Sequence, residues 1–319
     1  ILFNIVFGTC EKVLINDPKG HHQVVLSLCY AGERGYSGSA DRKVCVWELD
    51  HTKHDEFCTC VGELLGHYGS VWCIKADAVK IITGSSGMEI RIWDTSSLDQ
   101  LRVVEHAHKR SILCMHFSVD VLATGGADAT VRVFDLESTY KVPFKYVKIH
   151  RRLRGGRYGG HQDSVTAVHF AGTELVSGDA TGLLLIWDVH SGLVLRRCQT
   201  HTKWVRQITF DATKIVSCSD DCTVCVTDIS TGEVIDRLKT HSKPVLSCSF
   251  DTTEIISAGA DNIIGHAYFR RTTHEKTKRF HLMQPGESLG TLKRRYGSTI
   301  ADMKRWNNID NASLDVYTG

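Results

Sequence analysis

The 319-residue sequence lacks the features of long disordered segments, of membrane spans and of a strongly charged surface. It contains only four prolines and no Ser- or Gln-rich tract, so little of it is suited to extended disorder. No apolar run approaches the roughly 20 residues that a transmembrane helix needs, and we expect no membrane span. The formal net charge of +2 argues against binding nucleic acid through bulk charge. A composition with 42% hydrophobic and 23% charged residues predicts a globular protein.

The twelve cysteines favour a reduced, intracellular protein over a disulfide-bonded one. Most of them fall inside predicted strands, where a free cysteine behaves as a small hydrophobic residue. We therefore expect a cytoplasmic location. The cysteines on predicted strands are Cys29, Cys45, Cys73, Cys114, Cys218, Cys225 and Cys248.

One spacing recurs six times along the chain. A histidine is followed 26 residues later by Trp or by a substitute on an apolar strand, and a Ser or Thr stands ten residues before that second residue. Self-similarity at a fixed period indicates a repeat architecture. The pairs are His21–Trp47, His67–Trp93, His108–Phe134, His161–Trp187, His201–Thr227 and His241–Ala267, and the hydroxyl residues are Ser37, Thr83, Thr124, Ser177, Ser217 and Ser257.

Each repeat of about 40 residues contains four short apolar runs that are separated by turn residues, a pattern typical of a β-propeller blade. The repeats lack the apolar stripe of 3.6-residue period that a helical solenoid needs, so we predict an all-β fold for this part of the chain. In the fifth repeat the four runs contain Val205, Ile208 and Phe210; Ile215 and Val216; Val224 and Val226; and Val234, Ile235 and Leu238.

The repeats resemble those of the WD-repeat family. Gly66-His67 pairs with Ile92-Trp93-Asp94, and Gly160-His161 pairs with Ile186-Trp187-Asp188. The resemblance implies a WD-repeat β-propeller in which a His, a Ser or Thr, an Asp and a Trp form a buried hydrogen-bonded tetrad in each blade.

In this sequence the Asp of the tetrad stands 20 residues after the His, but Gly87 and Thr181 occupy that position in the second and fourth repeats. We therefore expect those two blades to be held less firmly. The resemblance implies one complete tetrad, made of His21, Ser37, Asp41 and Trp47, and partial ones made of His108, Thr124 and Asp128; His161, Ser177 and Trp187; and His201, Ser217 and Asp221.

The same histidines and aspartates would suit a catalytic or metal site, because His with Asp serves in both. However, the combination recurs once per repeat, which would distribute identical sites around a ring. We interpret these residues as structural. The sequence therefore predicts no catalytic residue, no metal site and no cofactor.

The propeller is predicted to span residues 1–271 and to be followed by a linker at residues 272–279. Six repeats are visible, and residues 8–15 align with the fourth strand of a further unit. We expect a seven-bladed ring whose first unit begins ahead of Ile1, because closing the ring removes exposed sheet edges.

Two insertions interrupt the regular spacing. The first, residues 50–60, contains Cys58-Thr59-Cys60, which could bind a metal or form a disulfide. No second Cys or His pair accompanies it at the spacing of a zinc site, so we predict no metal there.

The second insertion, residues 140–160, is basic and aromatic and contains no acidic residue. We predict that it binds an acidic partner such as a carboxylate-rich protein tail, and we prefer protein to nucleic acid because the rest of the chain is balanced in charge. The alternative is a solvated surface loop without a ligand. The candidate partner-binding residues are Lys141, Lys145, Lys148, Arg151, Arg152, Arg154 and Arg157.

Residues 280–319 resemble a LysM module, a small βααβ unit, through Pro285-Gly286-Glu287-Ser288-Leu289 and Lys304-Arg305-Trp306-Asn307-Asn308-Ile309. We expect its last strand to continue past Gly319. Many LysM modules bind glycans that contain N-acetylglucosamine, and a protein-contact role is the alternative that we favour. The glycan groove implied by the resemblance consists of Gly286, Glu287, Ser288, Leu289, Ile309, Asp310 and Asn311.

These features favour a non-enzymatic scaffold that binds other proteins in a larger complex, in the cytoplasm and in a cytoskeletal or ciliary assembly. One alternative is the substrate receptor of a ubiquitin ligase, because the repeats also resemble those of F-box WD-repeat proteins. The other is a glycan-binding protein that uses the LysM groove.

Overall fold

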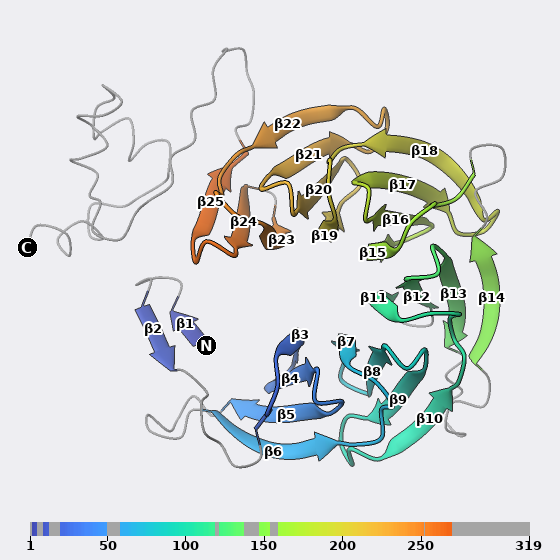
Figure 1. Cartoon of the computed structure of the whole chain (residues 1–319), viewed down its shortest axis with the longest axis vertical. Coiled ribbons are helices and arrows are strands. Elements are labelled where there is room, and N and C mark those ends of the chain that lie inside the picture. Colours follow the sequence, from blue (N-terminus) through green and yellow to red (C-terminus); the bar gives the residue numbers. More distant parts are fainter. Residues whose placement is uncertain are drawn as a thin grey trace, which may run out of the picture.

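The computed structural model describes residues 2–4, 9–12, 20–49, 58–118, 121–136, 147–153, 159–251 and 253–269. Within these residues it contains 25 strands and no helix, and so no helix that could cross a membrane. The strands form seven antiparallel sheets around a central opening (Figure 1). The prediction of an all-β propeller is therefore confirmed.

Five sheets have four strands in a meander, and we number them as blades one to five in chain order. The sixth blade has three described strands. The strands are β3 (Val25–Ala31), β4 (Arg34–Ser39), β5 (Val44–Leu49) and β6 (Cys58–Leu64); β7 (Val71–Ala76), β8 (Lys80–Ser85), β9 (Ile90–Asp94) and β10 (Gln100–Val104); β11 (Ile112–Ser118), β12 (Val121–Gly126), β13 (Val131–Leu136) and β14 (Val147–Leu153); β15 (Val165–Ala171), β16 (Glu174–Asp179), β17 (Leu183–Asp188) and β18 (Leu193–Gln199); β19 (Val205–Phe210), β20 (Lys214–Ser219), β21 (Val224–Asp228) and β22 (Val234–Leu238); β23 (Val245–Phe250), β24 (Glu254–Gly259) and β25 (Ile264–Tyr268).

The seventh sheet consists of β1 (Leu2–Asn4) and β2 (Thr9–Lys12), which pair antiparallel. Figure 1 shows it in the sector between blade six and blade one. Strand β2 falls inside residues 8–15, the segment that the sequence aligned with a fourth strand. The seven sheets agree with the predicted number of blades.

The basic insertion corrects one expectation. Residues 147–153, which the sequence placed in an insertion outside the regular repeat, form β14, the outer strand of blade three. β14 pairs with β13 from Val147 opposite Leu136 to Leu153 opposite Val131. The alternation of Val147 and Ile149 with polar residues is the sequence pattern of a strand, and the surrounding positive charge concealed it.

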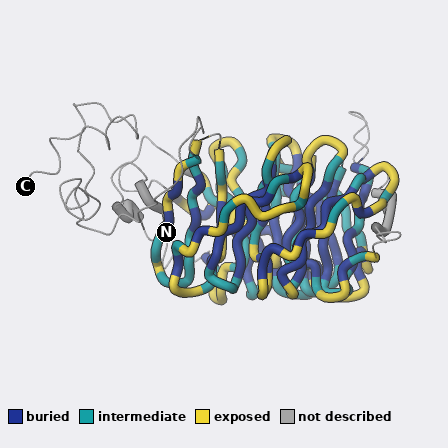
Figure 2. Tube along the Cα trace, turned by 90° about the horizontal axis from the view of Figure 1, so that it is seen from above, coloured by how far each residue is buried: buried dark blue, intermediate teal, exposed yellow. Residues whose placement is uncertain are grey.

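The core lies between the blades, where the faces of neighbouring sheets pack on each other. One buried cluster joins Ile82 and Ile90 of blade two to Ile112, Leu122 and Phe134 of blade three, and similar clusters follow around the ring. Figure 2 shows buried residues along the middle of the strands and exposed residues at the turns. Burying such a side chain contributes roughly 1.5–3 kcal/mol, so each blade depends on its neighbours.

Glycine on the second strand permits the close approach of consecutive blades. A Cβ atom added to Gly125 would lie 2.6 Å from Val165 Cγ1, and one added to Gly178 would lie 2.8 Å from Val205 Cβ. Both valines begin the inner strand of the next blade. Any larger residue at these positions would therefore push two blades apart.

We expect Gly178→Val to lower the free energy of unfolding by about 1–3 kcal/mol, because the extra atoms overpack the contact with Val205. The matched control is Ala258→Val, at the same register position of blade six. Ala258 is only partly buried, and the described residues place no further inner strand beside it. This change should stay within about 0.5 kcal/mol in denaturant unfolding. Equal losses in the two variants would contradict the packing argument.

Candidate functional site

In blade one, a histidine in the loop before the inner strand connects three other parts of the blade. His21 Nδ1 lies 3.0 Å from Asp41 Oδ2, and His21 Nε2 lies 2.7 Å from Ser37 Oγ. The Trp47 indole N–H donates to the same Ser37 Oγ at 2.7 Å. Asp41 also accepts the backbone N–H of His22 at 3.0 Å. The four predicted residues therefore form one network that ties a loop, a turn and two strands together.

Blades two and four were expected to lack the acidic member of this network, and this expectation was wrong. In blade two, Glu89 replaces the missing Asp, with Oε1 2.7 Å from His67 Nδ1. In blade four, Asp179 Oδ2 lies 2.8 Å from His161 Nδ1. Both acids stand two residues from the expected position, Glu89 after Gly87 and Asp179 before Thr181. A search for acids on either side of that position would have found them.

The remaining three blades keep the histidine, its acid and its hydroxyl but lack the indole. Phe134, Thr227 and Ala267 stand where Trp occurs elsewhere, and the buried Thr227 Oγ1 has no hydrogen-bond partner. Their histidine Nδ1 atoms lie 2.9–3.0 Å from the acid oxygens. The three sets are His108, Asp128 and Thr124; His201, Asp221 and Ser217; and His241, Asp261 and Ser257.

The networks hold their acids in the charged form. Burial would raise the pKa of Glu89, but hydrogen bonds from His67, Ser85 and the Tyr68 N–H outweigh it and lower the pKa to about 2. Burial dominates at His67, whose pKa is lowered although Glu89 opposes the shift. At His201 the balance reverses, because hydrogen bonds to Asp221 and Cys225 outweigh burial and raise the pKa to about 9.

Both ring nitrogens of each network histidine lie within hydrogen-bond distance of a group in the same blade. None of the six is therefore free to bind a substrate or a metal. Among the described residues, no group of three or more His, Cys, Asp or Glu side chains is placed to hold a metal ion. Of the CxC pair, Cys60 is buried on β6, and Cys58 lies at a position whose side chain is outside the described residues.

We expect Glu89→Ala to lower the free energy of unfolding by about 1–3 kcal/mol, because it leaves the His67 ring and the Tyr68 N–H without their buried acceptor. Denaturant unfolding would measure this loss, and the m-value should stay unchanged.

The double variant Gly87→Asp/Glu89→Ala places an acid at the position that blades one, three, five and six use. The Gly87 N–H already donates to Ser85 Oγ at 2.9 Å, as the Asp41 N–H does to Ser39 Oγ at 3.2 Å. Recovery of about half of the lost stability or more is expected. A double variant no more stable than Glu89→Ala would show that the two positions are not equivalent.

A second histidine cluster lies between the inner strands of blades three and four. The His116 and His169 ring centroids are 4.2 Å apart, and His169 packs edge-on against Phe210 at 5.0 Å. The Phe170 N–H donates to His116 Nδ1 at 3.4 Å, whereas the buried His169 Nδ1 has no partner. Burial, together with the positive charge of Lys75, lowers the pKa of His116 to about 3 and that of His169 to about 4.

This cluster predicts acid sensitivity. A histidine has a pKa of about 6.5 in the unfolded chain. Because the folded values are lower, the unfolded state binds protons first, and stability falls as the pH drops from about 6.5 toward 4. The free energy of unfolding should fall between pH 7 and pH 5, and we expect His169→Asn to reduce this fall by about 1 kcal/mol or more. The exposed His190→Asn is the control and should leave the slope unchanged; an unchanged slope in both variants would refute the cluster's role.

The predicted partner-binding residues are divided between described and undescribed segments. Lys148, Arg151 and Arg152 lie on β14, and their side chains are outside the described residues. The other members of this set, the linker and the whole glycan groove also lie outside the described residues: Lys141, Lys145, Arg154, Arg157, residues 272–279, Gly286, Glu287, Ser288, Leu289, Ile309, Asp310 and Asn311.

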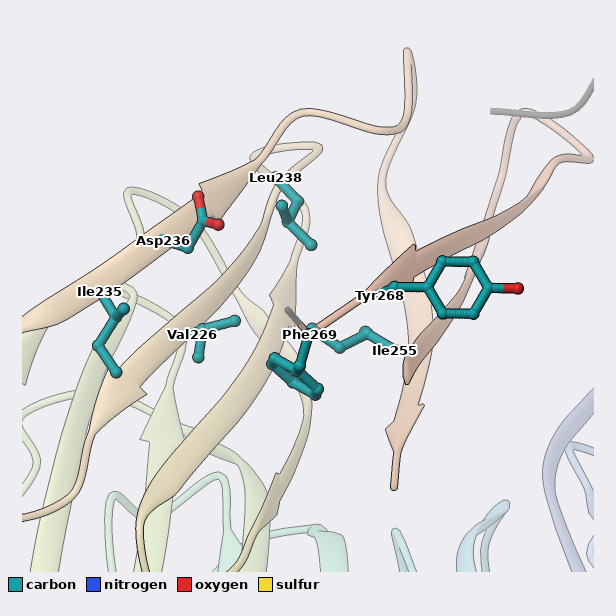
Figure 3. Close-up of a pocket in the computed structure, with 7 residues that line it drawn as sticks. All are labelled: Val226, Ile235, Asp236, Leu238, Ile255, Tyr268 and Phe269. Atoms are coloured by element: carbon teal, nitrogen blue, oxygen red, sulfur yellow. The ribbon is translucent and has the colours of Figure 1, made fainter. Parts of the chain in front are cut away.

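A small, mostly apolar pocket lies between blades five and six (Figure 3). Asp236 supplies its one charged side chain, and Tyr268 lies at its edge with the hydroxyl group pointing away from the other lining residues. No motif in the sequence indicated it, because it depends on how two sheets are placed beside each other. Its lining consists of Val226, Ile235, Asp236, Leu238, Ile255, Tyr268 and Phe269.

The ring of blades, each tied by a His–hydroxyl–acid network, defines a β-propeller. Residues 100–270 match the model of the Nucleolar protein 10-like, N-terminal domain, residues 8–48 and 58–94 match the WD domain, G-beta repeat, and residues 281–319 match the LysM domain. The first match alone covers more than half of the 319 residues. The chain therefore belongs to this family of WD-repeat β-propellers, and it carries a C-terminal LysM domain.

Several curated proteins are similar to the propeller. Mitochondrial division protein 1 of Neurospora crassa is 26% identical over 239 residues, which is 59% of this chain and 36% of that protein. The Kluyveromyces lactis protein of the same name is 26% identical over 213 residues, 58% of this chain and 29% of that protein. F-box/WD repeat-containing protein 9 of Bos taurus is 29% identical over 178 residues, 54% of this chain and 36% of that protein. The chain thus spans about a third of the length of these relatives.

Proposed function

We propose that the chain is a non-enzymatic protein-interaction scaffold and that the basic surface of blade three binds an acidic segment of its partner. In the regular blades, the polar groups of the His–hydroxyl–acid networks hydrogen-bond to one another and hold the blade together. Blade three departs from this regularity by its insertion, which places Lys148, Arg151 and Arg152 within five residues of one outer strand. That concentration of positive charge is the observation that carries the proposal.

The register of blade three extends this basic surface. Ile112 pairs with Gly126, the adjacent Gly125 pairs with Val131, and Val131 pairs with Leu153, so the end of β14 lies at the same end of the sheet as the start of β11. Lys109 and Arg110 directly precede β11 and are exposed. An acidic segment that follows this end of the blade would therefore meet cations from two elements, and charge complementarity would accelerate its association.

The chemistry of such a partner is a run of carboxylates on an extended protein tail. The near-neutral net charge of the whole chain favours a protein over nucleic acid. Acidic tails of cytoskeletal polymers have this chemistry, and we extend the proposal to a cytoskeletal or ciliary assembly in the cytoplasm.

We expect Arg151→Glu/Arg152→Glu to weaken binding of a fluorescein-labelled peptide of ten glutamates by about tenfold or more at low ionic strength. Fluorescence anisotropy would measure it. The matched control is Arg196→Glu/Arg197→Glu on β18, because these two arginines occupy the same register positions in blade four. Equal weakening by both variants would show that the peptide responds to net charge and not to blade three. These substitutions are preferable to deleting residues 140–160, which would also remove β14.

A second candidate function is that of a ubiquitin-ligase substrate receptor. It is supported by the similarity to F-box/WD repeat-containing protein 9 over 54% of this chain. Co-purification of ubiquitin-ligase subunits with the protein from its native source would favour it over the general scaffold. Their consistent absence would count against it.

A third candidate function is glycan binding by the LysM domain, which rests on the match over residues 281–319. Titration of the whole chain with chitin oligomers tests it. If neither the heat signal nor the fluorescence intensity changes at millimolar sugar, this role is excluded.

A further inference from the structure

Strand β25 has an unpaired outer edge among the described residues. In blades one to five the third strand pairs with a fourth strand, whereas β25 pairs only with β24. The Phe269 N–H donates to Thr253 O at 2.6 Å. Because hydrogen-bonded residues alternate along an antiparallel pair, the amides of Gly265 and Ala267 also face β24. Those of His266 and Tyr268 therefore point to the open edge.

The exposed side chains of β25 include the large hydrophobic residues Ile264 and Tyr268, with the polar His266 between them. Ile264 is 56% exposed, whereas Leu184 and Val224 at the same register position are fully buried in clusters with the inner strand of the following blade, and the described residues place no such strand beside blade six. In those blades a fourth-strand residue, Cys198 or Leu238, pairs with that position and is itself buried. The pocket of Figure 3, with Ile235 and Tyr268 exposed at its rim, lies between this sheet and blade five.

The sequence directly after β25 is a poor match for a fourth strand. In blades two, four and five an apolar residue of the fourth strand follows the Trp position by eleven residues: Val104 after Trp93, Cys198 after Trp187 and Leu238 after Thr227. Eleven residues after Ala267 stands Lys278, and residues 270–279 contain no apolar residue. Burying a lysine between two sheets without a partner would be strongly unfavourable.

We propose that β25 accepts an extended segment of a partner protein as the fourth strand of its sheet. The His266 and Tyr268 amides bind its backbone, as in other cases of strand addition to a sheet edge. Two apolar side chains four residues apart, spaced like Val194 and Cys198 of β18, cover the positions beside Ala267 and Ile264. This edge and the basic strand β14 lie on opposite sides of the ring in Figure 1, so the proposal is independent of the acidic partner of blade three.

A synthetic peptide with the sequence of residues 229–240 tests the proposal, because it contains the fourth strand of blade five with Val234 and Leu238 four residues apart. We expect the fluorescently labelled peptide to bind the whole chain saturably. A peptide with aspartate in place of both apolar residues should bind at least about tenfold more weakly, because burying a carboxylate beside Ala267 or Ile264 without a partner is unfavourable. Absence of saturable binding, or equal affinity of the two peptides, would overturn the proposal.

The variant His266→Pro removes an amide that points to the open edge but none that pairs with β24. It should weaken binding of the peptide by at least about tenfold, whereas His266→Thr, which keeps the amide, should change it by less than about threefold. Equal binding by His266→Pro and the unmodified chain would overturn the proposal.

Hydrogen exchange gives a second readout that needs no variant. In the chain alone, the amides of His266 and Tyr268 should exchange fast, while that of Ala267 is protected. The peptide should slow the exchange of the His266 and Tyr268 amides. Protection of His266 and Tyr268 before any peptide is added would show that the chain covers its own edge, and would also overturn the proposal.

Discussion

The whole ring depends on one arrangement, in which a histidine bridges an acidic side chain and a hydroxyl group inside each blade. His21 connects Asp41 in a turn to Ser37 on the second strand, and the same geometry recurs in five further blades. Because these groups are buried, losing the acid or the hydroxyl would leave a polar atom of the histidine unpaired, and all six blades keep both groups. The packing between blades then requires small residues such as Gly125 and Gly178 on the second strand. Together these constraints leave few polar groups of the regular blades free for chemistry.

The repeat spacing was sufficient to predict the propeller, since the His and hydroxyl residues recur at one spacing in six repeats, each with four short apolar runs. It was insufficient for Glu89 and Asp179, because a carboxylate can reach the same histidine from a position two residues away on a tight turn. The positions of the histidine and the hydroxyl residue in the repeat are therefore constant, whereas the position of the acid varies.

Strand β14 and the edge of β25 show a different limit of sequence interpretation. Residues 147–153 have the alternation of a strand, but their positive charge suggested a loop, and it is the free edge of β13 that supplies the pairing partner. The proposal for the edge of β25 rests on the absence of apolar residues from positions 270–279. Both features depend on the neighbouring strand as well as on the local sequence. They are also the places where the ring departs from its own regularity, and we assign partner binding to them.

We propose that the regular blades form a frame and that the basic end of blade three contacts the partner. Cross-linking of the protein with its native partners through lysines, followed by mass spectrometry, tests this claim most directly. The account predicts that links to a partner concentrate at Lys109 and Lys148 of blade three. Links found only at lysines of other blades, such as Lys43 and Lys203, would contradict it.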